Sequence, residues 1–279
     1  MQWREERVDG HGAQLHVRRV VDPPAPAVLL LHGLGVGGVV WQAFARRLLP
    51  HLAAIAPDLR GHGQSDAPPS GYTPDDYAND LAALIESEGQ PVPIVGHSLG
   101  ALVALSLAER EPSRVPWVVL LDPPLDADLR NTEVESVARL RHAPAGELEA
   151  YLHTRNPGGG QLLANSLARL FRQASDEAFD VMLGPRGQTV AAAFDLASRV
   201  KQPVLVIQAD PTQGGVLGDA AAKAFVSRLP RGHLQKIEGA THALHASHPA
   251  QVAQAILAFG RSDGDAYDGG SDDGSSGSR

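Results

Sequence analysis

The chain has 279 residues, of which 43% are hydrophobic, and a formal net charge of −8 at neutral pH. This length and composition predict one sizeable hydrophobic core, and the acidic balance argues against a nucleic-acid partner. The absence of cysteine excludes a disulfide framework, a thiolate metal site and a cysteine nucleophile. The charged start of the chain and the lack of a long apolar run predict a cytoplasmic protein without a signal peptide or a membrane span.

Short apolar runs alternate with helical patterns along the chain. Residues 4–20 are typical of two strands joined by the turn sequence DGHG. Further strands are predicted for the apolar runs at 28–31, 52–56, 92–95, 115–121, 203–208 and 234–237. Helices are predicted for 41–49, 77–88 and 249–259, and for the stretch that follows residue 98. Continuous apolar strands between helices predict an α/β fold with a doubly wound, mostly parallel sheet.

The alternation is interrupted once, between residues 125 and 200, where helical patterns occur without a strand. These patterns are Val134–Leu140, Leu148–Tyr151, Leu162–Phe171, Phe179–Leu183 and Val190–Ala197. We interpret 125–200 as a helical cap inserted into a core formed by 1–124 and 201–260. The remaining segment, 261–279, consists mostly of Gly, Ser and Asp. It cannot bury enough apolar area to offset its ordering entropy, so we predict that it is disordered.

A G-x-S-x-G motif, Gly96 to Gly100, lies between an apolar run and a helical pattern. Strand, sharp turn and helix in this order would project the hydroxyl of Ser98 above the edge of the sheet. The N–H of Leu99 would lie at a helix start, where negative charge is favoured. The motif in this context predicts that Ser98 is a nucleophile.

A serine nucleophile needs a base, a carboxylate that orients the base, and donors for an oxyanion. His242 follows the last predicted strand by a short loop, and we predict that it is the base. The spacing of His245 and His248 could also suggest metal ligands, but no carboxylate stands at a matching position, so no metal is predicted.

The main-chain N–H groups of Leu34 and Leu99 are the predicted oxyanion donors. Leu34 lies in a glycine-rich turn that directly follows the apolar run at 28–31. Such a turn could instead hold a phosphate, but a phosphate loop needs a Lys or a Ser/Thr that opens a helix, and Val39, Val40 and Trp41 follow here.

Four stretches together resemble the α/β-hydrolase family, in the order that the family has. They are LLLHGLGVGG (29–38), DLRGHGQSD (58–66), GHSLG (96–100) and GATHALHASHP (239–249). The resemblance covers about residues 5 to 260. It implies an α/β-hydrolase fold, a triad in the chain order serine, acid, histidine, and no cofactor. It also implies that the turn at 58–66 organises a loop and takes no part in catalysis.

The acid is the member of the triad for which the sequence offers two candidates. The family usually places it in a G-x-x-D turn after the strand at 203–208, but Thr212 stands at that position and Asp210 lies two residues earlier. Other members place the acid directly after the preceding central strand, which here gives Asp122. We predict Asp122, with Asp210 as the second candidate, because the run Gly214–Leu217 resembles the turn of members that use the earlier strand.

These residues predict a serine hydrolase that cleaves a small or medium apolar carboxylic ester, thioester or lactone through an acyl-enzyme. A small, apolar substrate is suggested by the Leu, Val and Phe residues of the cap. A C–C bond hydrolase of diketone-type substrates would use the same residues in different roles. Acyl transfer to an alcohol, and ligand binding without catalysis, are also compatible with these residues. The sequence makes no prediction of oligomeric state.

Overall fold

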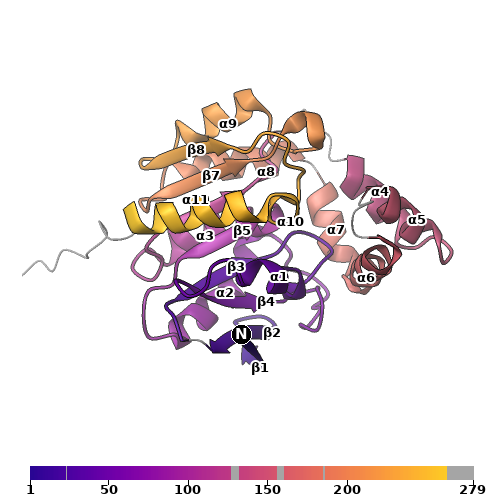
Figure 1. Cartoon of the computed structure of the whole chain (residues 1–279), viewed down its shortest axis with the longest axis horizontal. Coiled ribbons are helices and arrows are strands. Elements are labelled where there is room, and N and C mark those ends of the chain that lie inside the picture. The colour runs from indigo at the N-terminus through magenta and orange to yellow at the C-terminus, as the bar shows by residue number, and fades with distance from the viewer. Residues whose placement is uncertain (23, 127–131, 156–159, 185, 263–279) are drawn as a thin grey trace, which may run out of the picture.

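The computed structural model describes residues 1–22, 24–126, 132–155, 160–184 and 186–262. In this part of the chain, eight strands form one sheet in the order β1-β2-β4-β3-β5-β6-β7-β8, with helices on both faces (Figure 1). The strands β3 to β8 run parallel, whereas β1 and β2 are antiparallel to their neighbours. The predicted α/β class with a mostly parallel, doubly wound sheet is therefore confirmed.

The strands agree closely with the apolar runs of the sequence. They are β1 (Gln2–Asp9), β2 (Gln14–Asp22), β3 (Ala27–Leu31), β4 (Ala53–Pro57), β5 (Ile94–His97), β6 (Val118–Leu121), β7 (Val204–Gln208) and β8 (Gly232–Lys236). The central strands β4 to β7 are buried at every position because helices cover both of their faces. One hydrophobic cluster lies on each face of the sheet, and the carboxyl ends of these strands meet at one edge.

The core helices are α1 (Gln42–Ala45), α2 (Pro74–Ser87), α3 (Leu99–Arg110), α9 (Asp219–Val226), α10 (Leu244–Ser247) and α11 (Pro249–Ser262). The helices α9 and α10 were not predicted, and α1 and α2 differ from their predicted ranges. The helix predicted for 41–49 is a short 3-10 helix, η1 (Gly38–Trp41), followed by the single turn α1. The N–H groups of Arg47 and Leu48 then bond three residues back, to Phe44 and Ala45, so tight turns replace further helix.

The helix α2 begins three residues before its predicted start. Thr73 and Asp76 form a reciprocal capping box, in which each side chain accepts from the other residue's main-chain N–H. Pro74 occupies the first helical position, where its missing N–H would have no partner in any case. The start of α2 is thus determined by its cap and not by its apolar periodicity.

The predicted helical insertion between β6 and β7 is confirmed. It contains α4 (Thr132–Leu140), α5 (Glu147–Arg155), α6 (Gly160–Gln173), α7 (Asp176–Leu183) and α8 (Arg186–Ala197). In Figure 1, α4 to α7 lie to one side of the sheet, whereas α8 packs along α3. None of the described helices is long and apolar enough to cross a membrane. The helix α11 continues to Ser262, and the rest of the predicted disordered tail lies outside the described residues.

Candidate active site

Ser98 occupies a sharp turn between β5 and α3. Its φ of 54° and ψ of −116° are uncommon for a residue with a side chain. The strand and the helix approach closely: a Cβ on Gly96 would lie 2.1 Å from the oxygen of Gly100, and one on Gly100 would lie 2.4 Å from the oxygen of Leu31. Only glycine fits at these two positions, so the motif holds Ser98 in its strained conformation at the carboxyl edge of the sheet.

His242 lies on the loop after β8, and its Nδ1 is 2.7 Å from Oδ2 of Asp122. Asp122 directly follows β6 and is completely buried. Its carboxylate also accepts hydrogen bonds from the N–H groups of Val216, at 2.9 Å, and Ala209, at 3.3 Å. An ionised carboxylate only accepts, so Nδ1 of His242 donates, and in the neutral imidazole this tautomer leaves the lone pair on Nε2.

Asp210, the second candidate for the acid, has other partners. Its Oδ1 accepts from the N–H of Thr212 at 2.9 Å and from the hydroxyl of that residue at 2.7 Å. Its Oδ2 accepts from the N–H of Gly239 at 3.0 Å. The Gly239 N–H and then the Thr212 donors lower the pKa of this carboxyl. Of the two predicted candidates, the structure brings Asp122 to His242, and Asp210 connects the turn after β7 to the loop before His242.

The two predicted oxyanion donors lie in segments next to Ser98. Leu99 is the first residue of α3, where a main-chain N–H has no partner within the helix. Leu34 lies in the turn after β3, and that turn packs against the nucleophile, because a Cβ on Gly33 would lie 3.3 Å from Cβ of Ser98. Main-chain N–H groups that converge on one point can stabilise a tetrahedral oxyanion, so Leu34 and Leu99 stay the predicted donors.

Aromatic side chains of the insertion cover the turn that carries Leu34. A Cβ on Gly35 would lie 2.3 Å from Cδ1 of Phe171 in α6 and 2.9 Å from Cζ of Phe179 in α7. Gly35 has a φ of +79°, which also favours glycine. The sequence did not single out these two phenylalanines, since nothing local relates them to a turn more than 130 residues away. They place an apolar surface directly beside the turn that carries Leu34, which we call the oxyanion turn after its predicted role.

The side chain of Asp58 holds the turn at 58–66 in place through several hydrogen bonds, in line with the loop-organising role that the resemblance implies. The buried carboxylate of Asp58 accepts from Arg18 at 2.8 Å, and from the N–H groups of Gly38 at 2.7 Å and Gln64 at 3.0 Å. Burial alone would raise the pKa of Asp58, but the donors, Gln64 and Arg18 foremost, lower it overall. This network fixes the loop after β4 against the start of η1.

The histidines that follow His242 do not have the geometry of a metal site. His245 lies in the core, with its ring centre 4.5 Å from that of Trp41. Nδ1 of His248 instead contacts the hydroxyl of Ser247. In the ranges that the structure describes, no group of three or more His, Cys, Asp or Glu side chains could hold a metal ion.

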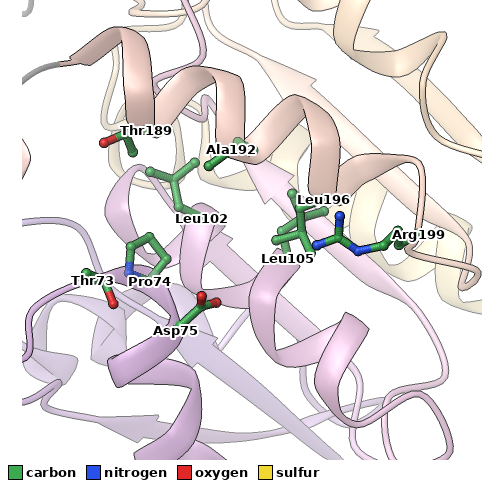
Figure 2. Close-up of a pocket in the computed structure, with 10 residues that line it drawn as sticks. Thr73, Pro74, Asp75, Leu102, Leu105, Thr189, Ala192, Leu196 and Arg199 are labelled. Atoms are coloured by element: carbon green, nitrogen blue, oxygen red, sulfur yellow. The ribbon is translucent and has the colours of Figure 1, made fainter.

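A cavity of about 360 Å³ lies away from this site, between α2, α3 and α8. Leu102 and Leu105 of α3 face Ala192 and Leu196 of α8 across it (Figure 2). Thr73, Pro74, Asp75, Thr189, Ala193 and Arg199 complete its lining. Ser98, Asp122 and His242 are not among the lining residues, so this cavity belongs to the contact between the insertion and the core.

A sequence model of the Alpha/beta hydrolase family matches residues 28–255. The chain belongs to this family. It is 31% identical over 271 residues to 2-(acetamidomethylene)succinate hydrolase of Mesorhizobium japonicum, which covers 91% of this chain and 94% of that protein. It is 28% identical over 254 residues to the pimeloyl-[acyl-carrier protein] methyl ester esterase of Aromatoleum aromaticum, covering 83% and 96% respectively.

Solved structures give the same result for the fold. The crystal structure of E-2-(acetamidomethylene)succinate hydrolase superposes with a TM-score of 0.75 at 26% identity, over 92% of this chain and 99% of the other. The α/β-hydrolase fold with its helical insertion between β6 and β7 is therefore shown, and the protein is a hydrolase of this fold. The names of these relatives imply that they cleave different types of bond, so they do not identify a substrate for this chain.

Proposed function

We propose that this α/β hydrolase is a serine hydrolase that cleaves a small or medium apolar carboxylic ester, thioester or lactone through an acyl-enzyme. The observation that carries the proposal is the 2.7 Å contact between His242 and the buried carboxylate of Asp122, at the edge where Ser98 stands. This contact leaves Nε2 of His242 with a lone pair, which is the state that a general base needs.

In the proposed reaction, Nε2 of His242 takes the hydroxyl proton of Ser98 while Oγ attacks the carbonyl carbon of the substrate. The oxyanion accepts hydrogen bonds from the N–H groups of Leu34 and Leu99. The ionised Asp122 stabilises the imidazolium that forms. His242 then protonates the leaving alkoxide or thiolate, and the same groups activate a water molecule that hydrolyses the acyl-enzyme.

The apolar character of the substrate is supported by the residues that lie beside the oxyanion turn. Phe171 and Phe179 of the insertion pack against Gly35, one residue from Leu34. An acyl chain bound at the oxyanion donors would therefore contact aromatic rings. The family membership and the esterase among the relatives agree with an ester substrate, and the same active-site residues would serve a C–C bond hydrolase of diketones.

The proposal is tested with nitrophenyl esters graded by acyl length, with lactones and diketones assayed alongside. We expect ester or lactone turnover and covalent labelling of Ser98 by a fluorophosphonate, located by peptide mapping. Ser98→Ala should lower turnover by about 10⁴-fold or more without unfolding the protein. Ser106→Ala is the matched control, since Ser106 is a buried serine on α3, the helix that follows Ser98, and its hydroxyl donates to Asp75 at 2.5 Å.

Labelling at another residue, or unchanged turnover in Ser98→Ala, would refute the nucleophile. Diketone cleavage without ester turnover would refute the ester proposal and show that the protein is a C–C bond hydrolase. A folded protein that turns over no member of the panel and takes no label would favour a ligand-binding relative.

A further inference from the structure

A buried histidine, His97, contacts both the ring and the main chain of His242, and a second buried histidine, His245, packs on His97. His97 is the last residue of β5 and directly precedes Ser98 in the chain. Its ring centre lies 4.6 Å from that of His242 and 4.8 Å from that of His245. His245 in turn packs on Trp41, so the four rings form a continuous series of tilted and edge-to-face contacts from the core to His242.

His97 also makes a directed contact with the loop that carries His242. Its Nε2 lies 2.9 Å from the main-chain oxygen of His242. A carbonyl oxygen only accepts, so Nε2 of His97 carries the proton and Nδ1 keeps its lone pair. The Nδ1 side faces the oxyanion turn, because a Cβ on Gly33 would lie 3.0 Å from Nδ1.

We propose that His97 is a positioning residue for the hydrolase reaction: its neutral ring sets the spacing between the loop of His242 and the turn of Leu34, on either side of Ser98. The inference rests on the proposed function. One ring is covalently next to the nucleophile, donates to the main chain of the base, and packs on the turn that supplies an oxyanion donor. Small errors in such spacing reduce the rate strongly, since reaction requires the groups at near-attack distances.

The neutral state of His97 suits this role. Burial lowers the pKa of His97 well below its usual value, and the neighbouring His242 and His245 lower it further. His242 becomes positively charged when it takes the proton of Ser98. A charged His97 at a ring distance of 4.6 Å would oppose that charge, whereas a neutral ring does not.

The test compares side chains that differ in where they can donate. In His97→Gln the amide nitrogen can reach the place of Nε2, in His97→Asn it reaches only that of Nδ1, and His97→Leu has no donor. We expect His97→Gln to retain kcat within about threefold. His97→Asn and His97→Leu should lose about tenfold or more in kcat with KM nearly unchanged, because the oxygen of His242 loses its donor. The labelling rate of Ser98 by a fluorophosphonate should fall in parallel with kcat.

His245→Leu is the matched control, because His245 is as buried as His97 and contacts it ring to ring. It should keep kcat within about threefold even where its melting temperature falls. A loss in His97→Gln as large as in His97→Leu, or losses that simply follow the melting temperature across all four variants, would overturn the positioning role. Failure of the proposed function is recognised separately, by activity that persists in Ser98→Ala.

Discussion

The protonation of His245 gives a quantitative test of the packing around His242. The residue is 7% exposed, its ring lies between those of Trp41 and His97, and its Nδ1 has no hydrogen-bond partner. Burial, assisted by the nearby His242, lowers the pKa of His245 from 6.5 to about 3. Between these two values the unfolded chain binds a proton that the folded protein does not. The free energy of unfolding therefore falls as the pH falls below 6.5.

The size of the effect depends on how far the pH lies below 6.5, the pKa of His245 in the unfolded chain. At about pH 5 the titration of His245 lowers the free energy of unfolding by about 2 kcal/mol, since each pH unit below 6.5 lowers it by about 1.36 kcal/mol. His245→Leu removes this titration but no other. The difference in unfolding free energy between the wild type and His245→Leu should therefore change by about 2 kcal/mol, in favour of the variant, between about pH 7.5 and pH 5.

Urea unfolding at stepped pH values measures this difference. Val252→Ala is the control, because Val252 is a fully buried apolar residue on α11. Truncation of Val252 should lower the free energy of unfolding by roughly 1.5–3 kcal/mol at every pH and leave its pH dependence parallel to that of the wild type. A parallel curve for His245→Leu would mean that the folded protein protonates His245 freely, and the buried stack of rings would then be wrong.

Two further predictions concern the acid and the oxyanion turn. Asp122→Asn should lower kcat by about 10³ to 10⁴-fold, whereas Asp210→Asn should lose less than about tenfold, in steady-state ester hydrolysis. The reverse order would assign the role to Asp210. Gly35→Ala should lower the melting temperature more than Gly89→Ala. Both glycines have positive φ, but a Cβ added at Gly35 would lie 2.3 Å from Cδ1 of Phe171, whereas one added at Gly89 would meet nothing within 4 Å. Equal losses would show that the rings of the insertion do not press on the turn.

The parts of the molecule that the sequence predicted are those that local chemistry determines. The turn at Ser98 follows from Gly96 and Gly100, whose missing side chains allow strand and helix to approach. The strands β5 and β6 follow from apolar runs, since burial on both faces requires apolar residues at every position. The helix predicted for 41–49 was too long, because amphipathic spacing does not distinguish a helix from successive tight turns.

The contacts that complete the candidate site are long-range, and the sequence does not specify them. Phe171 and His97 contact residues of the oxyanion turn that lie far from them in the chain, and no local pattern relates them. The helix α9 was also missed, although Asp219 in its first turn and the buried pair Ala222 and Phe225 are typical of a helix with one apolar face. The helix α9 therefore had a local signal that the sequence reading did not use, whereas the contacts of Phe171 and His97 appear only in the folded chain.

The sheet gives the two candidate aspartates different partners, although the chain order allows either to be the acid. The strands β6 and β7 are adjacent and parallel, so residues after both strands reach the same edge. Asp122 binds the end of β7 through Ala209 and the following turn through Val216. The run Gly214–Leu217, which pointed to the earlier strand, is thus the turn that helps to hold the carboxylate of Asp122.

Asp210 instead connects two loops, and this contact accounts for the threonine at position 212. Thr212 stands where the family usually places an acid, and both its N–H and its hydroxyl donate to Asp210. The second oxygen of Asp210 accepts from Gly239, three residues before His242. In the proposed reaction Asp122 therefore acts on the imidazole ring of His242, and Asp210 acts on the loop that carries it. This division requires Asp122→Asn to reduce kcat through the tautomer of His242, whereas loss of Asp210 can act only through the position of the loop.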